Sequence, residues 1–191
     1  MKNVIGIFAL AVLFSGIILT SCQDSSQKIV VKTVKVKPIV KEDIIKAQKI
    51  WGDAIVNIGN AYNNKEDYKA LAETTVDELY GFDEGKVLFK PTKASEFPFR
   101  FTEDEAISYF VEGVVAEDQG FAIHTWSNVR FENAGIIIND NAATAMGNYY
   151  FTESTTGEEV KVEYTLGYFK NDEGKLLINV HHSSLPYKPA H

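Results

Sequence analysis

The sequence predicts an α+β domain in which about three N-terminal helices pack on one face of a curled antiparallel sheet. Up to residue 111, apolar residues recur every three or four positions, as they do on the buried face of an amphipathic helix. After Gly120, long stretches rich in β-branched and aromatic residues are separated by turns of Asn, Asp and Gly. Helices followed by a meander of strands favour the α+β class.

Two helices are predicted to open the domain. The first is marked by an apolar stripe at spacings of three and four: Ile44, Ala47, Trp51, Ile55, Ile58 and Tyr62. The pair Asn63-Asn64 breaks this pattern. A second helix is expected over residues 68–79 and ends at Gly81, because glycine readily adopts the conformation that closes a helix.

A short strand and a third helix follow. Residues 87–89 are expected to form an apolar strand, which Pro91 ends because proline has no N–H for a ladder. Thr102 and Glu105 form a capping box, in which each side chain accepts a hydrogen bond from the other residue's backbone. The third helix is predicted to run from this box to Val111.

The second half of the chain is predicted to form strands over residues 121–133, 136–138, 142–152, 159–170 and 175–180. The intervening turns contain the Asn, Asp and Gly residues that hairpin reversals favour. A sheet that curls around a long helix leaves a conical pocket between the two. That pocket is where a functional site is expected.

The last strand leads into the stretch His-His-Ser-Ser-Leu-Pro-Tyr. Successive side chains of a strand point to opposite faces. His181 and Ser183 are therefore expected to share one face with Asn179, whereas His182 and Ser184 lie on the other face. One polar and one mostly apolar face are typical of a strand that lines a pocket.

The N-terminus has the pattern of an export signal. A positive charge precedes an apolar run over residues 4–19, of about the length expected for a signal peptide. The motif Leu-Thr-Ser-Cys that ends at Cys22 is similar to a bacterial lipobox. We therefore expect a signal peptide over residues 1–21, lipidation of Cys22, and a place in the cell envelope. Gln23 favours the outer membrane, facing the periplasm; the alternative is a transmembrane helix, for which the run is short.

The remaining chain is expected to hold a tether and one domain. Residues 22–40 comprise the lipidated cysteine and a flexible tether, and residues 41–188 form a single domain with room for a core. Cys22 is the only cysteine, which excludes disulfides, thiolate metal sites and cysteine nucleophiles. The formal net charge of −7 disfavours nucleic acid, which requires a basic face.

The order of elements resembles the nuclear-transport-factor-2-like (SnoaL-like) cone fold. The run from His181 to Pro186 matches the His-His-Ser-Ser-x-Pro motif of one bacterial and algal branch of the calcium/calmodulin-dependent protein kinase II association-domain family. Residues 87–92 and 129–133 fit the same branch, which includes the iota-class carbonic anhydrases. The resemblance covers residues 42–188 and implies a homodimer or higher homo-oligomer.

The resemblance implies reversible hydration of carbon dioxide to bicarbonate, with no cofactor required. The site residues that it implies are Thr92, Tyr109, His181 and Ser183. A histidine with a pKa near neutrality can accept the proton that this reaction releases. Hydroxyl groups can hold water and bicarbonate, because each acts as donor or acceptor.

Two other site hypotheses stay open. Arg130 is a weak candidate to bind bicarbonate, since an exposed ion pair with Glu132 or Glu163 is the commoner outcome for such a residue. A zinc site would have to join His124 and a carboxylate to a single histidine of the His-His pair, whose two members point to opposite faces.

The function has alternatives as well. The cone could be a non-catalytic oligomeric binding or assembly module, or another small-molecule lyase or isomerase of the SnoaL-like fold. In the first case His181 and Ser183 are polar groups that close the core. Hydroxyls at Thr92, Tyr109 and Ser183 together favour an enzyme, because an assembly module has no need of them.

Overall fold

The computed structural model describes residues 36–189. The expected signal peptide, the lipidation site Cys22 and most of the tether lie outside this range. No helix within it is long and apolar enough to cross a membrane. In chain order the elements are α1 (Lys41–Asn63), α2 (Tyr68–Leu79), β1 (Leu88–Lys90), α3 (Glu103–Val111), the 3-10 turn η1 (Ala122–His124), β2 (Trp126–Asn139), β3 (Ala142–Glu153), β4 (Glu159–Lys170) and β5 (Leu176–Ser184).

The three predicted helices are confirmed. The capping box of α3 forms as expected: the Thr102 hydroxyl accepts from the Glu105 N–H at 3.3 Å, and the Glu105 carboxylate accepts from the Thr102 N–H at 3.1 Å. Helix α3 ends at Val111, as predicted, and the next residue, Glu112, adopts a φ of 63°. The caps and the apolar spacing therefore fix these elements locally.

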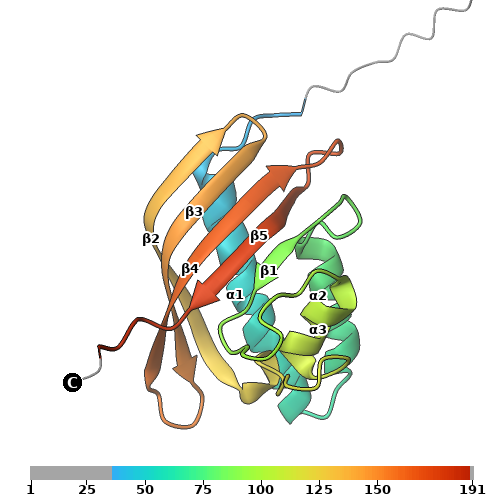
Figure 1. Ribbon diagram of the computed structural model, residues 1–191, viewed down its shortest axis with the longest axis vertical. Coiled ribbons are helices and arrows are strands. Elements are labelled where there is room, and N and C mark those ends of the chain that lie inside the picture. Colours follow the sequence, from blue (N-terminus) through green and yellow to red (C-terminus); the bar gives the residue numbers. More distant parts are fainter. Residues whose placement is uncertain (1–35, 190–191) are drawn as a thin grey trace, which may run out of the picture. The chain divides into compact units, whose positions relative to one another are not determined.

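The sheet is mixed rather than purely antiparallel. Its strand order is β1-β5-β4-β3-β2, and β1 pairs in parallel with β5, whereas the other neighbours are antiparallel. Strand β1 thus forms one edge of the sheet, beside the last strand of the chain. Figure 1 shows α1 running along one face of the sheet, with α2 and α3 beside β1.

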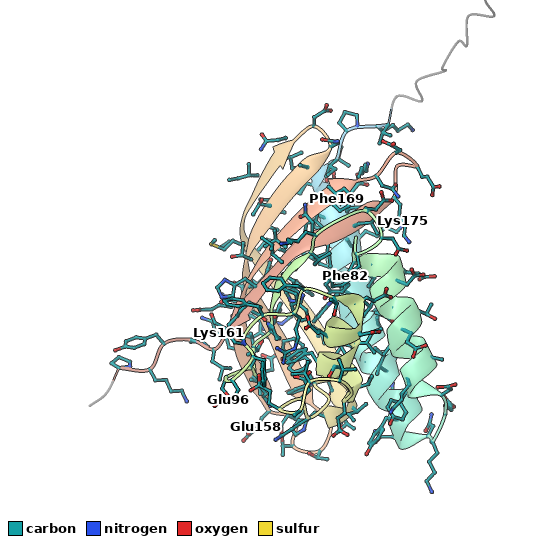
Figure 2. The ribbon with its side chains drawn as sticks, turned by 45° about the vertical axis from the view of Figure 1, so that its right-hand side comes forward. Phe82, Glu96, Glu158, Lys161, Phe169 and Lys175 are labelled. Carbon is teal, nitrogen blue, oxygen red and sulfur yellow. The ribbon has the colours of Figure 1, made fainter. Side chains whose placement is uncertain are left out.

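Helix α1 is held mainly by its buried stripe. Ile44, Ile55 and Ile58 are fully buried, and burying one such side chain stabilises the fold by about 1.5–3 kcal/mol. The stripe has one polar member, Gln48, whose amide donates to the Asn133 side chain at 2.9 Å. Side chains fill the space between α1 and the sheet (Figure 2).

The expectation of a strand from residue 121 is wrong. The chain instead forms η1, and Thr125 adopts a φ of 61° before β2 begins at Trp126. Two hydrogen bonds favour this turn: the Phe121 N–H donates to the Tyr109 carbonyl of α3 at 2.9 Å, and the Trp126 indole donates to the Phe121 carbonyl at 2.8 Å. His124 consequently lies on a turn at the end of the sheet.

From Trp126 on, the two strands predicted up to residue 133 and over residues 136–138 form one continuous strand, β2. A register shift between Asn133 and Gly135 lets β2 bend without breaking its pairing with β3. Gly147 lies across from this bulge, where an added Cβ would fall 2.1 Å from the Glu132 carbonyl oxygen. The bulge therefore requires a residue without a side chain at position 147.

Strand β5 extends further than predicted. It continues to Ser184 because β4 pairs with it as far as Glu163, and β1 pairs with it at residues 180–182. A bulge at Asn179 separates the Gly167–Val180 pair from the Tyr168–Ile178 pair. The bulge changes the phase of the strand, so that Ile178 and His181 are both buried and Asn179 does not continue the buried face.

We predict that Gly147→Ala destabilises the domain, because the new methyl group meets backbone that cannot move without disrupting the bulge. The expected loss in the free energy of unfolding is about 1–3 kcal/mol, measured by urea denaturation. Gly135→Ala is the matched control, since its Cβ would meet no atom within 4 Å. Equal stability of the two variants would contradict this account of the bulge.

Candidate functional site

The inward face of β5 carries one histidine and one serine. His181 and Ser183 are each 2% exposed, whereas His182, between them, is exposed. Strand alternation thus separates the two histidines as predicted. Of the two histidines, only His181 belongs to the interior of the cone.

Aromatic rings enclose the His181 imidazole. It stacks on Phe89 with centroids 4.8 Å apart, and Trp51 meets it edge-on at 5.4 Å. Tyr80 stacks on it from farther away, at 6.0 Å. Burial lowers the pKa of His181 to about 3, and the nearby His182 adds to the shift. The imidazole is therefore neutral at physiological pH.

Both nitrogens of His181 have tyrosine partners. Nδ1 lies 2.8 Å from the Tyr80 hydroxyl and Nε2 lies 3.5 Å from the Tyr149 hydroxyl. The Trp51 indole donates to the same Tyr80 oxygen at 2.9 Å. Within the described residues, Nδ1 is the acceptor within reach of the Tyr80 proton. This arrangement favours the tautomer with its proton on Nε2, directed at Tyr149.

Ser183 is connected to the end of β1. The Thr92 hydroxyl donates to the Ser183 hydroxyl at 2.9 Å, and the Lys90 ammonium donates to the Ser183 carbonyl at 2.9 Å. Burial raises the pKa of Tyr149, and hydrogen bonding to Ser183 opposes part of that shift. Ser183 therefore lies between the tyrosine that contacts His181 and the threonine that follows β1.

Tyr109 reaches the same place from α3. Its ring is 5% exposed, and its hydroxyl oxygen accepts from the Lys93 backbone N–H at 3.3 Å. Burial raises the pKa of Tyr109 well above its ordinary value, so the phenol keeps its proton. The structure thus brings Thr92, Tyr109, Ser183 and His181 into one region, in which His181 and Ser183 are the most buried.

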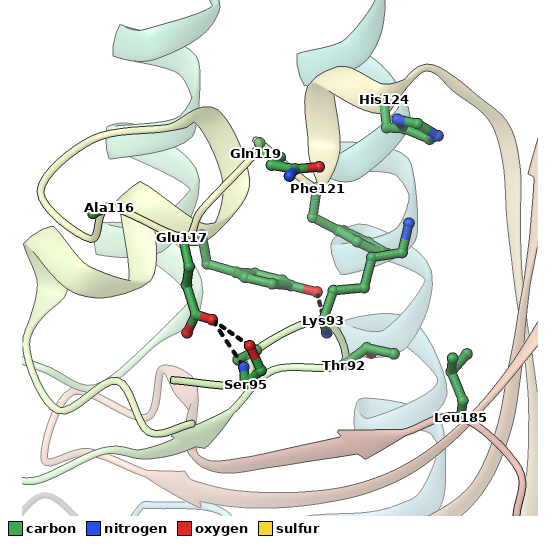
Figure 3. A pocket seen from close by; sticks show the side chains of 12 residues that line it. Thr92, Lys93, Ser95, Ala116, Glu117, Gln119, Phe121, His124 and Leu185 are labelled. Carbon is green, nitrogen blue, oxygen red and sulfur yellow. Dashed lines mark hydrogen bonds between the residues drawn. The ribbon is translucent and has the colours of Figure 1, made fainter. Parts of the chain in front are cut away.

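A cavity of about 620 Å³ opens beside this cluster (Figure 3). Thr92 and Tyr109 line it, whereas His181 and Ser183 do not. Its other lining residues are Lys93, Ala94, Ser95, Ala116, Glu117, Gln119, Gly120, Phe121, His124 and Leu185. The two hydroxyls on the wall are the members of the cluster that a small molecule in the cavity would meet.

Glu117 ties the two loops of the cavity wall together. Its carboxylate accepts from the backbone N–H groups of Ser95, Glu96 and Phe97 at 2.9–3.0 Å, as Figure 3 shows for Ser95. These bonds lower the pKa of Glu117 to about 2. The loop that begins with Thr92 is thereby fixed to the loop that follows α3.

Arg130 lies away from this site. Its guanidinium forms ion pairs with Glu159 at 3.3 Å and Glu132 at 3.7 Å, and it covers the Tyr150 ring at 4.0 Å. It is absent from the residues that line the cavity. Of the exposed ion pairs that the sequence left open, the one with Glu132 is found and the one with Glu163 is not.

The alternative of a zinc site requires that His124, a carboxylate and one histidine of the His-His pair converge. Within residues 36–189, no group of three or more His, Cys, Asp or Glu side chains is placed to hold a metal ion. His124 lines the cavity, but His181 is enclosed behind its wall. These two histidines do not converge as the zinc hypothesis requires.

Sequence reasoning missed the partners of His181. Tyr80 follows the end of α2, and Tyr149 lies within a strand, where aromatic residues commonly pair across strands and so give no sign of a site. Glu117 was also missed, since it lies in a loop without a recognisable motif. Only the strand alternation around Tyr149 gave any signal, because it places that hydroxyl on the buried face.

The sequence and the structure are similar to those of known carbonic anhydrases. A family model described as "Metal-independent carbonic anhydrase" matches residues 42–185. A metal-independent carbonic anhydrase from Nostoc sp. (strain PCC 7120) is 42% identical over 199 residues, and the match covers 97% of each chain.

Solved structures give the same result for the fold. The iota-carbonic anhydrase from a cyanobacterium, complexed with bicarbonate, is 44% identical with a TM-score of 0.76, over 80% of this chain and 95% of that chain. An NTF-2 like protein of unknown function from Shewanella oneidensis MR-1 is 15% identical with a TM-score of 0.46, over 75% and 97%. The described domain therefore shares the fold of the cyanobacterial iota-carbonic anhydrase, and its three helices packed on a five-stranded sheet confirm the predicted α+β class.

The buried imidazole predicts a specific pH dependence of stability. Below about pH 6.5 the unfolded chain takes up a proton at His181 that the folded domain does not, so this residue lowers stability by about 1.4 kcal/mol per pH unit down to about pH 3. Above pH 6.5 both states are neutral and the contribution vanishes. His181→Asn should remove this slope between pH 6.5 and 5, as measured by urea denaturation.

His182→Asn is the matched control, because this neighbouring histidine is exposed. It should keep the wild-type dependence of the free energy of unfolding on pH. If His181→Asn kept the wild-type slope as well, the imidazole would not be neutral in the folded domain.

Proposed function

The chain belongs to the metal-independent carbonic anhydrase family, and we propose that the cavity beside Thr92 and Tyr109 is where it interconverts carbon dioxide and bicarbonate. The family makes the protein a lyase that acts without a metal cofactor. One observation carries the placement: hydroxyls from three separate elements meet at or directly behind the wall of this cavity.

The hydration of carbon dioxide determines what the hydroxyl groups at this cavity must do. A water oxygen forms a bond to the carbon of carbon dioxide, one C=O π pair moves onto oxygen, and the water loses a proton. The site must hold the water, donate to the oxygen that gains charge, and let the proton leave. Without a cation to lower the pKa of water, placement and hydrogen bonding have to carry the catalysis.

Tyr109 is placed to donate to the oxygen that becomes negative. The Tyr109 oxygen accepts the hydrogen bond from the Lys93 N–H. The phenol does not use its own proton in that bond and can donate it to an acceptor in the cavity. Thr92 complements it, because its proton goes to Ser183 and its lone pairs remain for a water molecule. In this assignment Thr92 and Ser183 hold the attacking water, and Tyr109 stabilises the product charge.

His181 acts in our proposal through other residues. The sequence suggested it as the proton acceptor, but both of its nitrogens have tyrosine partners and burial lowers its pKa to about 3. A neutral imidazole instead directs its Nε2–H at the Tyr149 hydroxyl. This contact holds the Tyr149 phenol beside Ser183. We therefore assign His181 as a positioning residue.

The location of the protein is a separate proposal. The N-terminal pattern supports a signal peptide over residues 1–21, lipidation of Cys22, a tether up to residue 40 and a domain over residues 41–188. On this basis the enzyme is anchored to the bacterial outer membrane and faces the periplasm. Labelling with a fatty-acid analogue, lost in Cys22→Ser, would test the anchor.

Assembly is likewise proposed from the sequence motifs. The His-His-Ser-Ser-x-Pro run supports kinship with the association domain of calcium/calmodulin-dependent protein kinase II, and with it a homodimer or higher homo-oligomer. Light scattering of the purified chain measures this directly.

Removing single hydroxyls should reduce catalysis without unfolding the domain. Tyr109→Phe deletes the donor to the developing charge, and we expect kcat/KM to fall by about 100-fold. Ser183→Ala should lower it by about 10-fold, because Thr92 loses the acceptor that orients it. The measurement is stopped-flow hydration of carbon dioxide by the chain without residues 1–22.

Tyr150→Phe is the control for the loss of a tyrosine hydroxyl, because its ring lies under Arg130, away from the cavity. It should keep wild-type activity, and a chelator should leave all rates unchanged. Wild-type activity in Tyr109→Phe would contradict the proposed site. Activity lost to chelator and restored by zinc would contradict the metal-free mechanism.

A further inference from the structure

Hydration releases a proton, and the residues so far assigned do not accept it. His181 is enclosed by aromatic rings and both of its nitrogens are engaged. Hydroxyls can relay a proton but do not store it at neutral pH. The following inference rests on the proposed function and asks which side chain receives the proton.

Four ionisable side chains line the cavity: Lys93, Tyr109, Glu117 and His124. Glu117 is committed to the N–H groups of the 95–97 loop, which hold it as a carboxylate with a pKa of about 2. Tyr109 keeps its proton because burial raises its pKa. Neither residue can take up a proton from water near neutral pH.

Lys93 and His124 are the two ionisable side chains of this set that remain. A lysine ordinarily carries its proton already at neutral pH, so Lys93 contributes positive charge that suits a bicarbonate ion. Histidine is the side chain whose ordinary pKa allows it to gain and lose a proton between pH 5 and 8. His124 is therefore the one cavity-lining residue of the described range suited to exchange a proton with each turnover.

The position of His124 fits this role. It is the last residue of η1, it is exposed, and its ring lies 5.6 Å from that of Trp126. Figure 3 shows His124 and the Lys93 side chain on the same side of the cavity. One face of the imidazole can thus meet solvent while the residue borders the space that Tyr109 and Thr92 also line.

We propose that His124 is the proton-transfer residue of this enzyme. As the water oxygen bonds to carbon, its proton passes through solvent in the cavity to the His124 imidazole, which then releases it to a buffer base. Bicarbonate leaves with the negative charge, so atoms and charge balance without a further reactant. The charged groups that face His124 are Lys93 and Glu117 across the cavity, and Glu153 beside Trp126.

The test separates proton transfer from the chemistry at carbon. In weak, non-imidazole buffer we expect His124→Ala to lower kcat for hydration by about 10-fold, with kcat/KM nearly unchanged. Added imidazole should restore kcat in the variant. Exchange of oxygen-18 between carbon dioxide and water at equilibrium, which reports the step at carbon, should keep its wild-type rate.

His182→Ala is the matched control, because this histidine is exposed and does not line the cavity. His124→Gln, checked by thermal unfolding, provides a second variant that retains polarity at the turn. A wild-type kcat in both His124 variants, or a joint fall of kcat and kcat/KM without imidazole rescue, would overturn the proposal. Absence of oxygen-18 exchange in the wild-type protein would instead overturn the proposed function.

Discussion

The burial of one neutral imidazole is the interaction on which the rest of the site depends. His181 connects Tyr80, at the end of α2, to Tyr149 on β3, and it lies on β5. Loss of either tyrosine hydroxyl would leave a buried nitrogen without a partner, at a cost of about 1–3 kcal/mol. The same bonds that hold helices and sheet together therefore also keep the imidazole from acting as a base.

The hydroxyls of the proposed site are positioned by this core. Ser183 follows His181 by two residues on the same face of β5, and parallel pairing of β1 brings Thr92 within 2.9 Å of it. A slip of one residue would turn His182 and Ser184 inward instead. In the proposed site, His181 positions its neighbours because it is buried behind the cavity wall, and the Thr92 and Tyr109 hydroxyls are the ones that border the cavity.

Much of this was predictable from local patterns. The helices followed from apolar spacing and a capping box, and strand alternation placed Ser183 on the same face as His181. The turn at residues 121–125 was not predictable, because the Tyr109 carbonyl of α3 and the packing of the Trp126 indole decide it. The low pKa of His181 was equally hidden, since it depends on the aromatic rings that only the fold assembles around it.

The central claim is that His181 stays neutral, with its proton on Nε2, while the enzyme works. Nitrogen-15 NMR of the imidazole measures both the charge and the tautomer. Between about pH 5 and 8, where an ordinary histidine titrates, the account predicts constant His181 shifts typical of the Nε2–H form. A titration midpoint near neutral pH, or a proton on Nδ1, would contradict it and return His181 to the role of proton acceptor.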